Sequence, residues 1–205
     1  MGTGLALAGV PVGQGRILHE IRSVDGVDVQ TVAEGKGPTV LVLHGGMSDE
    51  SAWAGVAAKL ARHFRVVRLW RRLYRTDVPA DLAMDYGMEV QDVIALIESF
   101  DAPCLLVGHS SGAVVALEAL LARSGAFNGA VRPRLTSNAT IQTPTLLLTG
   151  QRSPERLRER VRLLAEAMPR ASVQELPGQS HGANLRAPGV VAEHIAAFAR
   201  SLHQR

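Results

Sequence analysis

The sequence predicts an α/β fold, with a doubly wound and mostly parallel sheet flanked by helices, and three observations support that prediction. Short apolar runs rich in branched residues alternate with segments whose apolar side chains recur at helical spacing. The chain has 205 residues, of which 46% are hydrophobic and 20% charged, so it is suited to one packed domain. No apolar run approaches ~18 residues, so no membrane-spanning helix is expected.

The strands are expected to begin with an antiparallel hairpin around the Asp25-Gly26 turn. Three later runs, 39–43, 104–107 and 145–149, are continuous apolar segments, which suit strands buried on both faces of a parallel sheet. The other expected strands are 16–23, 27–33, 65–69 and 172–176, with 128–131 as the best candidate for one more.

The helices are predicted from apolar side chains three and four residues apart. One segment, 112–121, is almost wholly apolar and is therefore expected to be covered on nearly all sides. The other helical stripes lie at 53–64, 90–97, 157–168 and 191–202.

The chain is interpreted as a loose, Gly/Ala-rich leader at residues 1–15 followed by one domain at residues 16–205. The leader has a short apolar stretch and no Lys or Arg before Arg16, which argues against a signal peptide. The single cysteine, Cys104, lies in an apolar run and is expected to be a small core residue. Since no internal disulfide is possible, the expected location is the cytoplasm.

The net charge of +3 is a small basic excess, and the acidic residues are mixed among the basic ones, so no nucleic-acid partner is expected. A denser run contains Arg68, Arg71, Arg72 and Arg75. A solvated or ion-paired connection is the favoured interpretation of this run. A contact for an anionic substrate beside a cleft is the alternative.

A candidate nucleophile lies where an expected strand gives way to the apolar helix. The segment Gly108-His109-Ser110-Ser111-Gly112 is a G-x-S-x-G pattern between the two. A serine on such a sharp turn needs flanking glycines, because side chains there would clash with the strand and the helix. The turn would expose the Ser110 hydroxyl at a helix N-terminus, where developing negative charge is stabilised.

Candidate oxyanion donors follow the expected strand 39–43, in the segment His44-Gly45-Gly46-Met47. Glycines there leave backbone N–H groups free to face a ligand. These groups, together with the N–H of Ser111, would hold an oxyanion; Gly46 is the best donor and Met47 the alternative.

The candidate base is His181, which follows the last expected strand at the sheet edge where Ser110 is expected. A free serine hydroxyl is a poor nucleophile and needs a base within hydrogen-bond reach. Of the other histidines, His109 is expected to point elsewhere and His44 to structure its own loop.

These three motifs, in this order, resemble the α/β-hydrolase superfamily over residues 16–203. The resemblance implies that Ser110 forms an acyl-enzyme, that His181 shuttles the proton and that an acid orients the histidine. The loop after strand 145–149 has no Asp, which leaves Glu155 as the nearest carboxylate for the third role. The region 128–144 is too short for the helical lid common in the superfamily, so either the lid is naturally reduced or absent, or a lid segment is missing from this sequence.

The resulting hypothesis is a serine hydrolase for an ester, thioester or lactone, with an open cleft that suits bulky or carrier-presented acyl groups. The alternatives are a binding or sensory protein, or a non-hydrolytic enzyme, with an incomplete triad. No sequence pattern for a metal or a nucleotide cofactor is present, so neither is expected.

Overall fold

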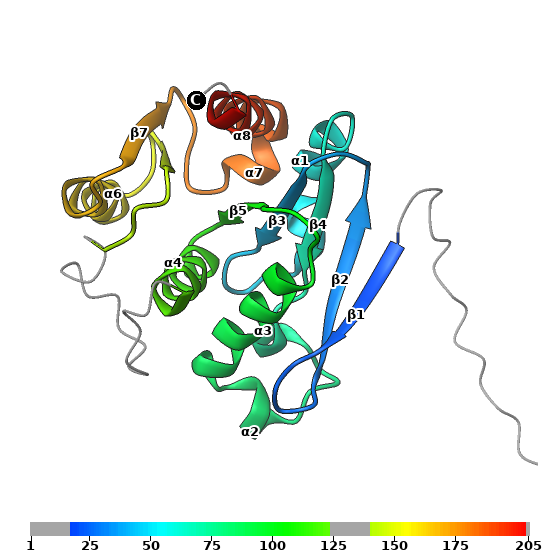
Figure 1. The fold of residues 1–205 in the computed structure, drawn as a ribbon. Helices are drawn as coiled ribbons and strands as arrows, with labels where there is room; N and C mark the ends of the chain where they lie inside the picture. Colours follow the sequence, from blue (N-terminus) through cyan, green and yellow to red (C-terminus); the bar gives the residue numbers. More distant parts are fainter. Residues whose placement is uncertain (1–16, 124–139, 204–205) are drawn as a thin grey trace, which may run out of the picture.

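The strands of the computed structural model, which describes residues 17–123 and 140–203, form two sheets within these ranges. The first sheet has five strands in the order β1-β2-β4-β3-β5, and the second pairs β6 with β7 (Figure 1). The strands are β1 (Ile17–Arg22), β2 (Asp28–Glu34), β3 (Thr39–Leu43), β4 (Arg65–Leu69), β5 (Leu105–Gly108), β6 (Thr145–Gly150) and β7 (Ala171–Leu176).

The pairing of the strands confirms the predicted hairpin and the mostly parallel order. Strand β2 is antiparallel to both β1 and β4, whereas β3 is parallel to β4 and β5, and β6 is parallel to β7. The hairpin turn contains Gly26 at φ 84°, a left-handed conformation that glycine adopts without steric cost. The carboxyl ends of β3 and β5 meet at one edge, since Leu43 is opposite Gly108.

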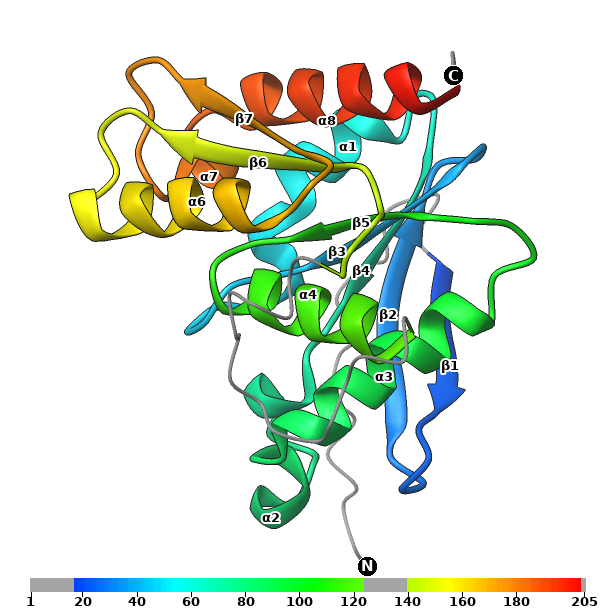
Figure 2. The same cartoon turned by 60° about the vertical axis from the view of Figure 1, so that its left-hand side comes forward.

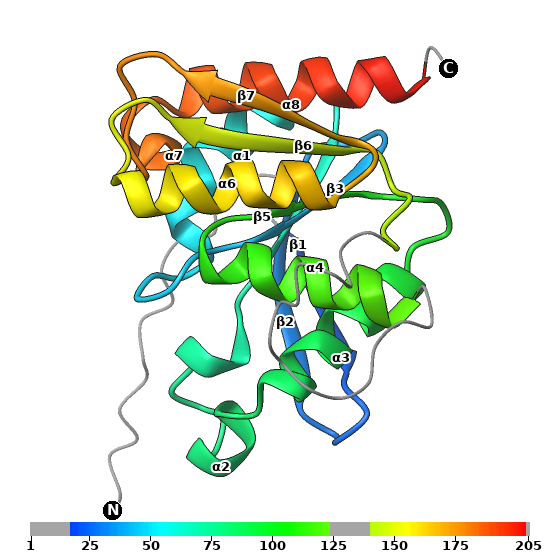
Figure 3. The same ribbon diagram turned by 90° about the vertical axis from the view of Figure 1, so that its left-hand side faces the viewer.

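Helices cover both faces of the first sheet (Figure 2). One apolar cluster packs α1, α7 and α8 on one face, and a second packs α3 and α4 on the other. Helix α6 lies against β6 and β7 (Figure 3). The bounds are η1 (Glu50–Trp53), α1 (Ala54–Leu60), η2 (Arg72–Tyr74), α2 (Ala80–Ala83), α3 (Tyr86–Glu98), α4 (Ser111–Arg123), α6 (Glu155–Ala167), α7 (Ala183–Arg186) and α8 (Pro188–His203).

The burial predicted for two of the strands was wrong. The side chains of β5 and all but the last of β6 are half-buried, whereas those of β3 after Thr39 are buried. The reason is that β5 and β6 each lie at an edge among the described strands. The second sheet nevertheless shares the first core, because Leu148 of β6 and Leu105 and Val107 of β5 pack against the same cluster.

The apolar helix α4 is covered as predicted, with only Arg123 at its end exposed. The predicted leader 1–15, the possible strand 128–131 and most of the lid region 128–144 lie outside the described residues. Within the described ranges, none of the helices combines the length and apolar character that a bilayer crossing requires.

Candidate active site

Ser110 lies on a sharp turn between the end of β5 and the start of α4. Its φ of 53° is left-handed, which is uncommon for a residue with a side chain. Glycines flank the turn because there is no room for a Cβ. One on Gly108 would lie 2.6 Å from the Cα of Ala113, and one on Gly112 would lie 2.6 Å from the Leu43 carbonyl oxygen. The turn leaves the Ser110 side chain exposed at the carboxyl edge of the sheet.

The start of α4 supplies one candidate oxyanion donor. Ser111 is the first residue of the helix, and the first N–H groups of a helix have no acceptor within it. The turn itself is closed by two backbone hydrogen bonds, from the Gly112 N–H to the His109 carbonyl and from the Ala113 N–H to the Ser110 carbonyl. The Ser111 N–H is thus available beside Ser110.

The loop after β3 lies against the same turn. A Cβ on Gly45 would be 3.3 Å from the Ser110 Cβ, and one on Gly46 would be 3.5 Å from the Ser111 Oγ. The Gly45 carbonyl accepts hydrogen bonds from His44 Nδ1 at 2.8 Å and Ser48 Oγ at 3.0 Å. Because the C=O and N–H of a trans peptide point in opposite directions, the Gly46 N–H points away from His44.

Met47, the alternative donor, is also left-handed, at φ 53°. Its side chain is 98% exposed, so this residue of the loop faces solvent. The structure thus brings Gly45 and Gly46 against Ser110 and Ser111, with Met47 at the rim.

His44 holds the loop after β3 in place by hydrogen bonds, which agrees with the structural role expected for it. A carbonyl only accepts, so the bond to Gly45 places a proton on Nδ1, and Nε2 accepts the backbone N–H of Arg71 at 3.2 Å. Burial lowers the pKa of His44 to about 4. The buried imidazole is therefore neutral near pH 7, with both nitrogens hydrogen-bonded.

His181 reaches the site from the loop after β7, and His109 is its neighbour there. The two rings lie 4.7 Å apart between centroids, and His109 Nε2–H donates to the His181 carbonyl at 2.9 Å. Trp53 contacts His109 edge-on, with the ring centroids 5.9 Å apart. His109, expected to point elsewhere, thus links the Ser110 turn to the candidate base. Burial lowers the pKa of both histidines.

The loop that carries His181 is held by the end of β6. The Arg152 N–H donates to the Gln179 carbonyl at 2.7 Å, and the Gly178 N–H donates to Gln151 Oε1 at 2.9 Å. A Cβ on Gly150 would lie 2.6 Å from the Gln179 carbonyl oxygen, so the two segments are in direct backbone contact. The second sheet therefore positions this loop.

Glu155, the carboxylate expected to serve as the acid, begins α6 as predicted and points elsewhere. It pairs with Arg158 and with Arg162, the latter at 2.9 Å, on the exposed side of that helix. Among residues 17–123 and 140–203, no carboxylate forms a hydrogen bond or ion pair with His181. The geometry brings the glycine loop against Ser110 and His181 against the adjacent His109, with no hydrogen bond between Ser110 and His181 among the residues that the structure describes, and it does not bring Glu155 to them.

The arginine run at the end of β4 and just after it is buried and ion-paired, which supports the ion-paired connection over an anionic-substrate contact. All four guanidinium groups are almost inaccessible to solvent. The pairs are Arg68 with Glu34 and Glu50, Arg71 with Glu89, Arg72 with Asp25 and Asp92, and Arg75 with Asp77.

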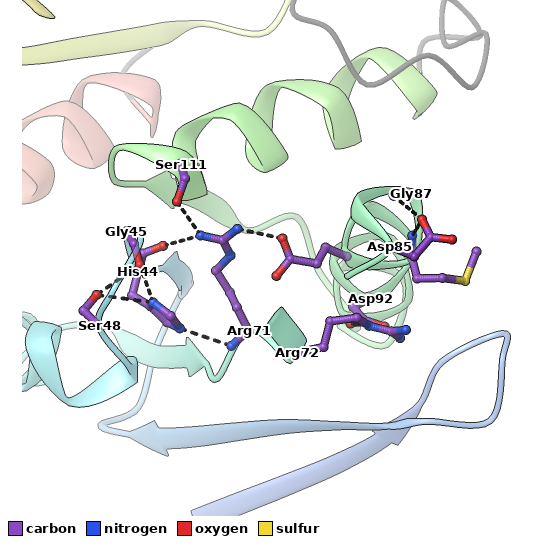
Figure 4. Close-up of polar contacts among 11 residues, drawn as sticks. His44, Gly45, Ser48, Arg71, Arg72, Asp85, Gly87, Asp92 and Ser111 are labelled. Carbon is purple, nitrogen blue, oxygen red and sulfur yellow. Dashed lines mark hydrogen bonds and ion pairs between the residues drawn. The ribbon is translucent and has the colours of Figure 1, made fainter. Parts of the chain in front are cut away.

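Arg71 is the residue of this run that touches the candidate site, and sequence reasoning did not single it out. Its Nη1 donates to Ser111 Oγ at 2.8 Å and to the His44 carbonyl at 3.1 Å (Figure 4). The sequence feature that pointed to this region was the alternation of Arg and apolar residues at the end of β4, but that pattern did not show which groups Arg71 binds. In the part of the chain that the structure describes, no cluster of three or more His, Cys, Asp or Glu side chains suits a metal ion.

Residues 40–156, more than half of the chain, match the alpha/beta hydrolase family, and the chain belongs to that family. Over 98 residues it is 32% identical to an uncharacterized hydrolase, YraK, of Bacillus subtilis, covering 46% of this chain and 36% of that protein. Over 96 residues it is 33% identical to a pimeloyl-[acyl-carrier protein] methyl ester esterase of Methylococcus capsulatus, a match that covers 45% of this chain and 35% of that protein. The matches thus span about a third of the length of these curated relatives.

Solved structures show the same fold. A serine hydrolase involved in carbazole degradation superimposes with a TM-score of 0.80 at 17% identity, covering 93% of this chain and 100% of that one. The thioesterase domain from the curacin biosynthetic pathway gives a TM-score of 0.77 at 17% identity, covering 90% and 100%. These likenesses show the α/β-hydrolase fold, in agreement with the family match.

Proposed function

We propose that the protein is a serine hydrolase that cleaves an ester, thioester or lactone through an acyl-enzyme on Ser110. The observation that carries the proposal is the left-handed turn that exposes the Ser110 side chain next to Gly45 and sets Ser111 next to Gly46. Such a turn costs conformational energy, which is typical of functional positions. His181 supports the proposal because its ring contacts the ring of His109, the residue next to Ser110.

In the acylation step, the Ser110 Oγ attacks the substrate carbonyl carbon and its proton passes to His181. The carbonyl oxygen becomes an oxyanion, for which the N–H groups of Ser111 and of Gly46 or Met47 are the proposed donors. The tetrahedral species collapses as the bond to the alcohol or thiol breaks, and the leaving group takes the proton from His181.

Water then attacks the acyl-enzyme, giving a proton to His181, and the acid product leaves as Ser110 recovers that proton. His181 is suited to this shuttle because burial lowers its pKa, so that the ring is neutral near pH 7. Without a carboxylate partner, a serine–histidine pair with oxyanion donors still accelerates the reaction, though less than a full triad.

The proposed substrates are small acyl compounds, with a carrier-presented acyl group as one form. The Methylococcus capsulatus relative is named for an ester on an acyl-carrier protein, and a structural neighbour is a thioesterase domain. The exposed Ser110 and the almost fully exposed Met47 are compatible with such a substrate, because a long acyl chain can approach from solvent.

The test is labelling with a fluorescent fluorophosphonate, in which Ser110 Oγ displaces fluoride from phosphorus and gives up its proton. Ser110→Ala should abolish labelling, and His181→Ala should slow it by at least about 10³-fold. Ser172→Ala, at an exposed serine of β7, is the matched control and should label normally. Unchanged labelling of folded Ser110→Ala would overturn the proposal.

Glu155→Gln tests the third expected member of the triad. Because Glu155 faces Arg158 and Arg162, the variant should hydrolyse p-nitrophenyl acetate within about twofold of the parent rate. A 10³-fold loss with an unchanged fold would instead assign Glu155 to the acid role.

A ligand-binding protein on the same scaffold is the second candidate, and one observation favours it: no described carboxylate contacts His181. On that alternative, the protein would bind an acyl compound without forming a covalent adduct. Intact-mass spectrometry after incubation with p-nitrophenyl acetate distinguishes the two, since only the hydrolase gains an acetyl group on Ser110.

A further inference from the structure

We propose that Arg71 is a positioning residue, which holds the glycine loop after β3 and the start of α4 at a fixed separation on either side of Ser110. The inference rests on the proposed function, because it assigns Arg71 to the oxyanion donors of that reaction. Arg71 does not touch the reacting atoms; it acts through the two segments that carry the donors.

The geometry that supports this role is a set of three hydrogen bonds made by one residue, two from its side chain and one from its backbone. Nη1 of Arg71 donates both to the His44 carbonyl at 3.1 Å and to Ser111 Oγ at 2.8 Å (Figure 4). The backbone N–H of Arg71 donates to His44 Nε2 at 3.2 Å. One residue thus fixes both the ring and the carbonyl of His44 and the side chain of Ser111.

A buried carboxylate orients the guanidinium group. Arg71 Nη2 is 2.6 Å from Glu89 Oε2 of α3, and the two side chains are 1% and 3% exposed. The Arg71 guanidinium also lies 5.1 Å from the centroid of the Tyr74 ring. Because the group is planar and held from three directions, its Nη1 has little freedom to move away from the site.

The contact with Ser111 has a chemical consequence. An arginine has only donors, so Ser111 Oγ accepts from Arg71 and its own proton remains to be given to another acceptor. The Ser111 Oγ and the Tyr74 hydroxyl oxygen lie 3.5 and 3.1 Å from the place that a Gly46 Cβ would occupy. Both hydroxyl groups therefore lie close to Gly46, beside the proposed backbone donors.

The test compares two variants that each remove a buried ion pair. Arg71→Met/Glu89→Met removes both charges, so neither is left buried and unpaired. Arg72→Met/Asp92→Leu/Asp25→Asn is the matched control, since Arg72 is equally buried and pairs with Asp92 of the same helix α3 and with Asp25, and this variant removes all three charges. Ser111→Ala removes one of the two contacts and leaves the ion pair in place.

The rates are measured with p-nitrophenyl acetate, per folded molecule. Arg71→Met/Glu89→Met should lower kcat roughly 10- to 100-fold with KM within about twofold, because displaced donors lose contact with the transition state. Ser111→Ala should lower kcat in the same direction. A variant that combines Ser111→Ala with Arg71→Met/Glu89→Met should have the kcat of the slower of the two, because both changes remove the same contact between Arg71 and Ser111. The control should keep the parental kcat.

Hydrogen exchange gives a readout that does not need catalysis. The amides of Gly112 and Ala113 are hydrogen-bonded within the turn, and that of His109 donates to the Leu43 carbonyl of β3. In Arg71→Met/Glu89→Met all three should exchange at least about tenfold faster, but not in the control. Faster exchange in both variants, or in neither, would overturn the positioning role. So would a parental kcat in a variant that labels at Ser110.

The two proposals fail separately. If the parent protein is not labelled by the fluorophosphonate, the hydrolase proposal is wrong, and the exchange of these amides still decides whether Arg71 holds the turn. If the parent is labelled and the Arg71 variant labels equally fast, the hydrolase proposal stands and the positioning role is wrong.

Discussion

The two halves of the candidate site are built differently. On the Ser110 side, Arg71 and Glu89 form an ion pair closed off from solvent, and His44 is buried beside them. On the His181 side, α6 has no buried side chain and its pairs, such as Glu155 with Arg162, are exposed to solvent. Both halves contain arginine–carboxylate pairs, so the difference lies in their burial.

Burial determines what such a pair does. An exposed pair contributes about 0–1 kcal/mol and constrains little, because water competes for both partners. A buried pair constrains geometry, because breaking it leaves a charge without water or partner. The serine and its proposed donors therefore lie on a rigid support, whereas the histidine depends on the β6 contacts and on His109.

The largest effect that separates the halves is expected from removing one carboxylate in each. Glu89→Ala leaves Arg71 buried without its partner and should lower the free energy of unfolding by about 3–5 kcal/mol. Glu155→Ala should leave the urea midpoint unchanged, because Glu155 is exposed. Urea denaturation followed by circular dichroism measures both. Equal shifts in the two variants would remove the distinction between the halves.

The next effect concerns pH. His44 has a folded pKa of about 4 against an ordinary 6.5, so the unfolded chain binds its proton first as the pH falls. The contribution of neutral His44 to the free energy of unfolding is complete above pH 6.5. About 2 to 3 kcal/mol of it is lost as the pH falls towards 4.

Urea titrations at pH 7.5 and 4.5 measure this term in the parent and in His44→Asn. The parent should lose more stability on acidification than the variant does. His63→Asn, at an exposed histidine, is the control and should follow the parent. An identical pH dependence in parent and His44→Asn would show that His44 does not titrate with folding.

The smallest effect on stability and activity is expected from changing His109, which contacts His181 and so joins the two halves of the candidate site. His109→Phe keeps a ring against His181 but removes the N–H donor to its carbonyl. It should cost roughly 1 kcal/mol of stability and lower kcat/KM roughly tenfold, because His181 is then less well held.

His194→Phe is the control for that variant. His194 also donates a ring N–H to a backbone carbonyl, that of Val190, within α8 and away from the candidate site. It should leave kcat/KM unchanged. An equal loss of activity in both variants would mean that His109 has no particular role at the site.

The sequence predicts those parts of the fold that depend on local pattern. Strands β3 and β4 have the predicted bounds, and the glycines around Ser110 indicate the sharp turn, because no other residue fits there. The class of fold follows from the alternation of strands and helices, which the family match confirms.

The features that the sequence did not predict depend on contacts between distant segments. Arg71 and Glu89 are 18 residues apart, and nothing local to either shows that they meet. His109 contacts a carbonyl 72 residues away. Likewise, the half-burial of β5 follows from its position in the sheet and not from its composition, since its residues are as apolar as those of the buried β3.

The difference in burial also determines which peptide bonds of this chain a protease can reach. Trypsin cuts after arginine and lysine, and only two of the 22 basic residues, Lys36 and Lys59, are lysines. The buried arginines after β4 are shielded, whereas Arg152 lies exposed in the turn between β6 and α6. A single cut there would place Ser110 and His181 on separate polypeptides, held together by non-covalent contacts such as the pairing of β6 with β7 and the hydrogen bond from His109 to the His181 carbonyl.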